Sequence, residues 1–289
     1  MKITAILSLS IICLLIGHST TISANIVQRR YQILTNSCAE LASSTATRGL
    51  NKRISLGVIT IEIDHPNGEI SGGSAGFGAI RFIGKPNKFV ACHEVFHLLW
   101  ENLSLNFVPP MPMFPATASG KTTELYESLP QIFSILANGK CQFTQTAQVV
   151  AAFSFDHCQY FYRNELPSAK TRYAMAKEYL ASQGIENAII NYLYSTASPT
   201  EPSAYDASRP LGAILFNALE DCGRDFLLSE LISFLYTSAR NNDQEKGIFD
   251  NTDKFGKYFI LSMIDPHKKS KQECREDLIK GLKYLGPFL

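Results

Sequence analysis

The sequence predicts an α+β fold in which a small antiparallel sheet comes first and a mainly helical half follows. Residues 55–63 alternate in polarity with a period of two and are rich in β-branched side chains, as half-buried strands are. From residue 88 onward, apolar residues recur mostly at helical spacing. The 289 residues are 45% hydrophobic and 18% charged, which is typical of a globular chain with a substantial core and excludes intrinsic disorder.

The first 24 residues have the composition of a secretory signal peptide. Lys2 supplies a short basic segment, residues 3–17 are almost uncharged and apolar, and Ala24 ends a small, polar stretch suited to cleavage. The apolar run is shorter than the roughly 20 residues that span a bilayer, which disfavours the alternative of an uncleaved membrane anchor. We therefore expect a secreted or periplasmic protein without stable membrane insertion after cleavage.

The cysteines agree with export. An even number of cysteines in an exported chain predicts up to three disulfides, although the sequence does not determine how they pair. No CxxC pair occurs, which excludes a zinc ribbon. The six cysteines that follow the predicted signal peptide are Cys38, Cys92, Cys141, Cys158, Cys222 and Cys274.

The charge balance argues against a nucleic-acid partner. The chain has 27 basic and 26 acidic residues, and its formal net charge is +1. No basic run alternates with aromatic residues as a nucleic-acid groove requires. The sequence therefore argues against DNA or RNA binding as the function.

The segment before residue 84 predicts one helix and a small sheet. Residues 26–50 carry apolar side chains at helical intervals, and the strand at 55–63 ends in a turn at 65–68. A glycine-rich stretch, 72–78, leads into a further strand at 79–83. Glycine within a strand allows another group to approach the backbone closely.

Two helices are expected after the sheet. Asn87 can cap a helix at 88–106, and a second helix spans 123–137. The intervening segment 107–120 contains four prolines and is expected to be a loop. We interpret residues 25–139 as an N-terminal subdomain.

Residues 140–289 are expected to form a helical C-terminal subdomain. Two stretches in it, 173–195 and 212–238, each predict a helix, a glycine turn and a second helix. The segment between these two hairpins, 196–210, is rich in Ser, Pro and Ala and is expected to be a link.

The most informative motif is His93-Glu94-Val95-Phe96-His97, within the helix expected at 88–106. Positions i and i+4 share one face of a helix, so both imidazoles can reach one metal ion. Glu94 lies near the same cavity, where a carboxylate can take a proton from a metal-bound water. The surrounding helix is apolar, and two buried histidines without a metal would each need another polar partner. The sequence therefore favours a metal site.

Two positions exclude one subclass of zinc hydrolase. A metzincin would continue as HExxHxxGxxH, but Trp100 stands at the glycine position and Leu103 at the third histidine. A catalytic zinc site still needs a third protein ligand. The candidates on the following helix are Glu124 and Glu127.

The stretch Glu127-Ser128-Leu129-Pro130-Gln131-Ile132-Phe133 resembles the glutamate helix of the gluzincin zinc metallopeptidases, which often reads E-G-L-A-E-Y-F. Its position about thirty residues after the second histidine is similar to the bacterial collagenase-like branch. Ser128 and Pro130 depart from that pattern. The resemblance implies a zincin-like fold in which Glu127 joins His93 and His97 as the third Zn²⁺ ligand, with Glu124 as the alternative.

Zincin sites also need a donor that stabilises the developing oxyanion. By its placement at the start of the first helical hairpin, Tyr173 resembles the tyrosine of this family. Tyr205 and His157 are the alternatives.

These observations predict an exported zinc metallopeptidase that acts on a peptide or protein substrate. His93, His97 and Glu127 would hold Zn²⁺, and Glu94 would act as the general base. The glycine-rich edge strand would bind the substrate backbone by strand addition. Two alternatives remain open: a catalytically inactive, zincin-like secreted binding protein, and a disulfide-linked helical domain without a metal.

Overall fold

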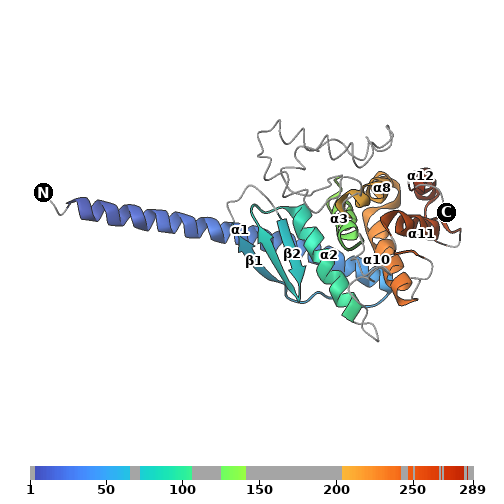
Figure 1. Cartoon of the computed structure of the whole chain (residues 1–289), viewed down its shortest axis with the longest axis horizontal. Helices are drawn as coiled ribbons and strands as arrows, with labels where there is room; N and C mark the ends of the chain where they lie inside the picture. Colours follow the sequence, from blue (N-terminus) through green and yellow to red (C-terminus); the bar gives the residue numbers. More distant parts are fainter. Residues whose placement is uncertain are drawn as a thin grey trace.

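The computed structural model confirms the α+β class, with a three-stranded sheet and eight helices in the part of the chain that it describes (Figure 1). Most of the described residues are helical, and most of the helices follow the sheet in sequence, as expected. The described residues are 4–65, 72–105, 125–140, 204–241, 247–249, 251–266, 268, 270–282 and 285.

The sheet is mixed rather than wholly antiparallel. It consists of β1 (Thr60–Asp64), β2 (Gly72–Gly76) and β3 (Ala79–Ile83) in the order β1-β3-β2. β3 pairs antiparallel with β2 and parallel with β1. The expectation of a wholly antiparallel sheet is wrong, because β1 runs parallel to its neighbour β3. After β1 the chain crosses to the opposite edge of the sheet to form β2, and it then returns as the central strand β3. β1 is also shorter than the strand expected at 55–63.

Helix α2 (Lys88–Leu105) lies along the sheet and is buried over most of its length. The Asn87 side chain accepts a hydrogen bond from the Phe89 amide at 2.8 Å, so the expected N-cap is present. One face of α2 packs on β2, and others pack on α1 (Thr4–Leu50) and α3 (Leu125–Asn138). Because α2 is surrounded by these elements, polar side chains on it can form a buried site.

The N-terminal part of α1 projects away from the other elements, and its C-terminal half packs on α2 and α10 (Figure 1). The helix expected at 26–50 is confirmed as this C-terminal half. Within the described ranges, no helix is both long and apolar enough to cross a membrane.

Among the described residues, the helical body consists of α3 and five later helices. Gly223, with φ of 84°, separates α9 from α10, which confirms the glycine turn expected within 212–238. The segment expected to be a link at 196–210 is helical from Ala204 onward, and the hairpin expected at 173–195 lies outside the described residues. The later helices are α8 (Ala204–Asn217), α9 (Leu219–Cys222), α10 (Arg224–Arg240), α11 (Thr252–Ile264) and α12 (Gln272–Leu282).

One hydrophobic core runs through both predicted subdomains. α3 packs on α8, and buried side chains such as Leu99, Phe133, Leu231 and Phe259 belong to the same cluster. Helix α3 is therefore packed between α2 and α8, which fixes the position of the side chains in its first turn.

In the part of the chain that the structure describes, two disulfides link helices that are far apart in sequence. Cys38–Cys92 joins α1 to α2, and Cys222–Cys274 joins α9 to α12. The loops that they close span 54 and 52 residues, and closing a loop of that length stabilises a fold by about 4 kcal/mol in the chain-entropy model. Cys141 and Cys158 lie outside the described residues.

Candidate metal centre

His93 and His97 lie one turn apart on the buried face of α2 and point toward the same space. Their Nε2 atoms are 3.2 Å apart. Both side chains are buried between α2 and α3. The i and i+4 spacing thus produces the shared face that the sequence predicts.

Glu127 approaches the same two atoms from the first turn of α3. Its Oε2 lies 3.0 Å from Nε2 of His93 and 3.7 Å from Nε2 of His97. The helix begins at Leu125, well before Pro130, so Glu127 has a fixed position on it. Pro130 only removes one i→i−4 hydrogen bond in the second turn. The alternative ligand, Glu124, lies outside the described residues.

The three ligand atoms fit a metal ion. The zinc-ligand distances of 2.0–2.1 Å in a tetrahedral site place neighbouring ligand atoms about 3.3 Å apart. The observed separations of 3.0, 3.2 and 3.7 Å are close to that value on all three edges. His93, His97 and Glu127 therefore form a buried group that could bind a metal ion.

Gln131 is a further residue of the site that the sequence analysis did not identify. Its Oε1 lies 3.2 Å from Nδ1 of His93. When Nδ1 donates to this oxygen, the ring is held with Nε2 on the side of Glu127, as in metal sites where a second residue orients the histidine. The signal was present in the sequence, because Gln131 follows Glu127 by four residues and shares its helix face.

The surroundings of His97 differ from those of His93. The ring of Tyr126 lies over His97, with 4.6 Å between the ring centroids. Nδ1 of His97 is buried and has no hydrogen-bond partner among the described residues. His97 is therefore held by packing and by its Nε2 neighbours.

For two of the three candidate ligands, His97 and Glu127, the direction of the pKa shift suits metal ligation. Burial, the largest effect, lowers the pKa of His97. Burial alone would raise the pKa of Glu127, but hydrogen bonds from His93 and His97 outweigh it and lower that pKa well below the ordinary range. Burial also acts to lower the pKa of His93, but Glu127 and Glu94 together raise it. An ionised carboxylate beside a neutral His97 imidazole is the state that binds metals.

Glu94 lies beside these ligands and against the edge strand. Its side chain is 5% exposed, and burial raises its pKa to about 7. A carboxyl group with a pKa near neutrality can both accept and donate a proton at physiological pH. A Cβ placed on Gly73 of β2 would lie 2.8 Å from Cγ of Glu94, so glycine at this position makes room for the carboxylate.

A second buried acid, Glu101, holds the end of the edge strand and was also missed by the sequence analysis. Both of its carboxylate oxygens accept from the Phe77 amide, at 2.9 and 3.0 Å. Glu94 and Glu101 are two helical turns apart, so α2 contacts β2 at two points. Such a contact depends on packing between distant segments and has no local pattern.

The other expected site residues cannot be placed with the cluster. Tyr173 and His157 lie outside the described residues, and Tyr205 lies in the first turn of α8. The oxyanion donor remains a prediction.

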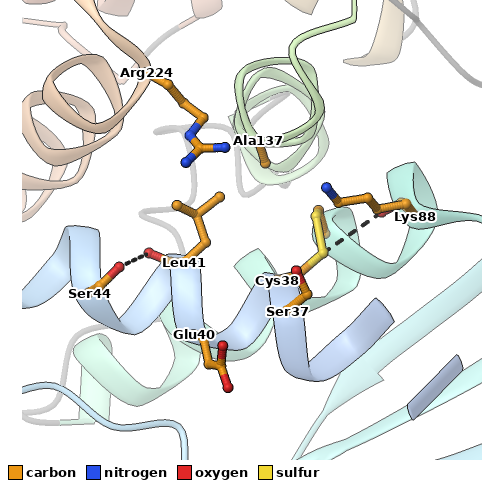
Figure 2. Close-up of a pocket in the computed structure, with 9 residues that line it drawn as sticks. Ser37, Cys38, Glu40, Leu41, Ser44, Lys88, Ala137 and Arg224 are labelled. Atoms are coloured by element: carbon orange, nitrogen blue, oxygen red, sulfur yellow. Dashed lines mark hydrogen bonds between the residues drawn. A yellow bond between two sulfur atoms is a disulfide. The ribbon is translucent and has the colours of Figure 1, made fainter. Parts of the chain in front are cut away.

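A separate cavity of about 310 Å³ lies near the N-terminal end of α2 (Figure 2). Lys88 and Arg224 point into it from two helices, and the Cys38–Cys92 disulfide lines it. None of the candidate metal ligands lines this cavity. It is distinct from the metal centre.

Comparisons with known proteins do not assign the chain. No protein-family model matches it, and no curated protein or solved structure shows significant similarity.

Proposed function

We propose that this chain is an exported zinc metallopeptidase that hydrolyses peptide bonds. The observation that carries the proposal is the approach of His93, His97 and Glu127 to within metal-ligand distance beside the buried acid Glu94. Three protein ligands leave a fourth position for water or substrate, which is typical of catalytic rather than structural zinc. The two disulfides support an oxidising compartment.

The donor set favours zinc. Two imidazoles and one carboxylate form a common catalytic zinc site, and the near-tetrahedral edges described above suit that ion. A bound zinc ion would make water a stronger nucleophile and polarise the carbonyl of the scissile bond.

The protein's own residues would then move the proton. Glu94 accepts a proton from the attacking water and donates it to the departing amine. In the absence of a metal ion, burial raises the pKa of Glu94 to about 7, which favours a group that exchanges protons near neutral pH. Glu127 and Gln131 hold His93 in one orientation from opposite sides of its ring, so the ligands need little rearrangement.

The edge strand supports a peptide as substrate. In the described sheet β2 is an edge strand, and its sequence Gly-Gly-Ser-Ala-Gly has few side chains to obstruct the backbone of an extended chain. Strand addition at this edge would place the substrate beside Glu94, which contacts Gly73. Replacing β2 with a proline-bearing segment should abolish peptide turnover, and unchanged turnover would remove this part of the proposal.

A Glu94→Gln variant tests the proposed activity. The amide keeps the size of the side chain but cannot accept the proton, so the variant should retain zinc and lose peptide cleavage by at least about a hundredfold. Glu62→Gln, the same change at an exposed site on β1, should leave both unchanged. Zinc-loaded wild type that cleaves no member of a peptide library would favour the alternative of an inactive binding protein.

A further inference from the structure

The turn between β2 and β3 places a bulky residue in an unfavourable conformation. Gly76 and Ala79 pair across the hairpin, which leaves Phe77-Gly78 as a two-residue loop. Their φ angles are 52° and 74°. Turns with two positive φ angles favour Asn-Gly, and an aromatic residue at the first position is a rare and costly choice.

A buried carboxylate maintains this conformation. Glu101 is 8% exposed and directs both oxygens at the Phe77 amide. A buried carboxylate is costly unless it is hydrogen-bonded, so the Phe77 amide and the Glu101 side chain depend on each other. The position of Phe77 relative to α2 is therefore closely defined.

The Phe77 ring contributes little to the fold that could explain its presence. The residue is 98% exposed, so its ring gains almost no burial. Asparagine would suit the turn better at no loss of packing. The turn thus presents an apolar ring to the outside at a conformational cost, a pattern found at functional positions.

The location of the ring relates it to the candidate metal centre. β2 starts beside Glu94, which contacts Gly73, and ends beside Glu101, which contacts Phe77. Four residues of strand span about 13 Å. An extended peptide on the free edge of β2 rises by the same amount per residue, so Phe77 lies about four positions from the peptide residue beside Gly73.

We propose that Phe77 is a specificity-determining residue that contacts an apolar substrate side chain about four residues from the scissile bond. The inference rests on the proposed peptidase function and adds a substrate class to it. The substrate is an extended peptide, and its apolar side chain covers the exposed ring.

The test uses paired peptides that carry Leu or Ser at the third, fourth or fifth residue on either side of the cleaved bond. Wild type should show a kcat/KM about fivefold to tenfold higher for Leu at one of these positions, as expected for an apolar contact. Phe77→Asn should bring that ratio close to one, while its Tm equals or exceeds that of wild type because asparagine suits the turn. Phe77→Leu should keep the preference.

Ile279→Asn is the matched control, because Ile279 is 54% exposed on α12. Its peptide preference should equal that of wild type. If Phe77→Asn does not fold, Phe77→Gly replaces it, because glycine tolerates the positive φ. An active wild type without a preference, or one whose preference survives in these variants, overturns this inference and leaves the peptidase proposal intact. A wild type that cleaves no peptide overturns both.

Discussion

Gly73 and Glu94 are in direct contact across the junction of β2 and α2. A Cβ on Gly73 would lie 2.8 Å from Cγ of Glu94, closer than real Cβ atoms approach, and 3.0 Å from Oε1 of the same side chain, which is a tight contact. The absence of a side chain on the strand therefore determines where the carboxylate lies. The position of the candidate general base, Glu94, therefore depends on the edge strand β2.

Gly73→Ala should displace Glu94 and lower kcat by about tenfold to a hundredfold, because proton transfer is sensitive to small misplacements. Zinc content should not change, because the three atoms nearest to the added Cβ all belong to Glu94 and none belongs to a candidate ligand. Gly72→Ala is the control in the same strand, since its Cβ would meet no atom within 4 Å. Equal kcat values for the two variants would contradict a role for this contact.

Gln131→Leu should weaken zinc binding by about tenfold to a hundredfold, because Nδ1 of His93 loses the group that orients its ring. Competition with a chromophoric chelator measures the affinity. Gln131→Glu keeps an acceptor oxygen and should bind zinc close to the wild-type level. If the Gln131→Leu variant binds zinc as tightly as wild type does, the proposed orienting role is wrong.

Tyr31→Phe should remove a pH-dependent contribution to stability. The Tyr31 hydroxyl donates to the Lys85 carbonyl at 2.8 Å, and burial raises the pKa of Tyr31 to about 12. A raised pKa favours the protonated form in the folded state, so the contribution is complete below pH 10 and is lost as the pH rises toward 12.

Urea unfolding of both proteins, with the disulfides intact, checks this prediction. At pH 8 the phenylalanine variant should be about 1 kcal/mol less stable, and the difference should shrink above pH 10. A difference that stays constant from pH 8 to pH 12 would contradict the assignment.

The Cys222–Cys274 disulfide should stabilise the fold without affecting the metal centre. Replacing both cysteines with serine should lower the free energy of unfolding by about 2–4 kcal/mol. Zinc content should stay at the wild-type level, because this link joins α9 and α12 and neither helix carries a candidate ligand. Loss of zinc from the folded variant would contradict the expectation that the disulfide and the metal centre are independent.

Local patterns account for much of the fold and for the three candidate ligands. Because His93 and His97 are four residues apart, any α-helix brings them to the same face. Glu127 is indicated by the resemblance of residues 127–133 to the glutamate helix described above. The helices expected at 88–106 and 123–137 differ from α2 and α3 by at most two residues at either end.

Features that depend on long-range packing were not predictable in this way. Alternation identifies strands but not their neighbours, so the parallel pairing of β1 with β3 was missed. The contacts of Gly73 with Glu94 and of Phe77 with Glu101 join residues more than twenty positions apart. They arise only when β2 packs on α2.

The most direct test of the account is the zinc content of the purified chain 25–289, measured beside His97→Ala, Glu127→Ala and the control Glu62→Gln. The account predicts about one zinc per chain in wild type and in the control, and little or none in the other two variants. Absence of zinc from every form, even after refolding with zinc, would contradict the metal centre and with it the proposed activity.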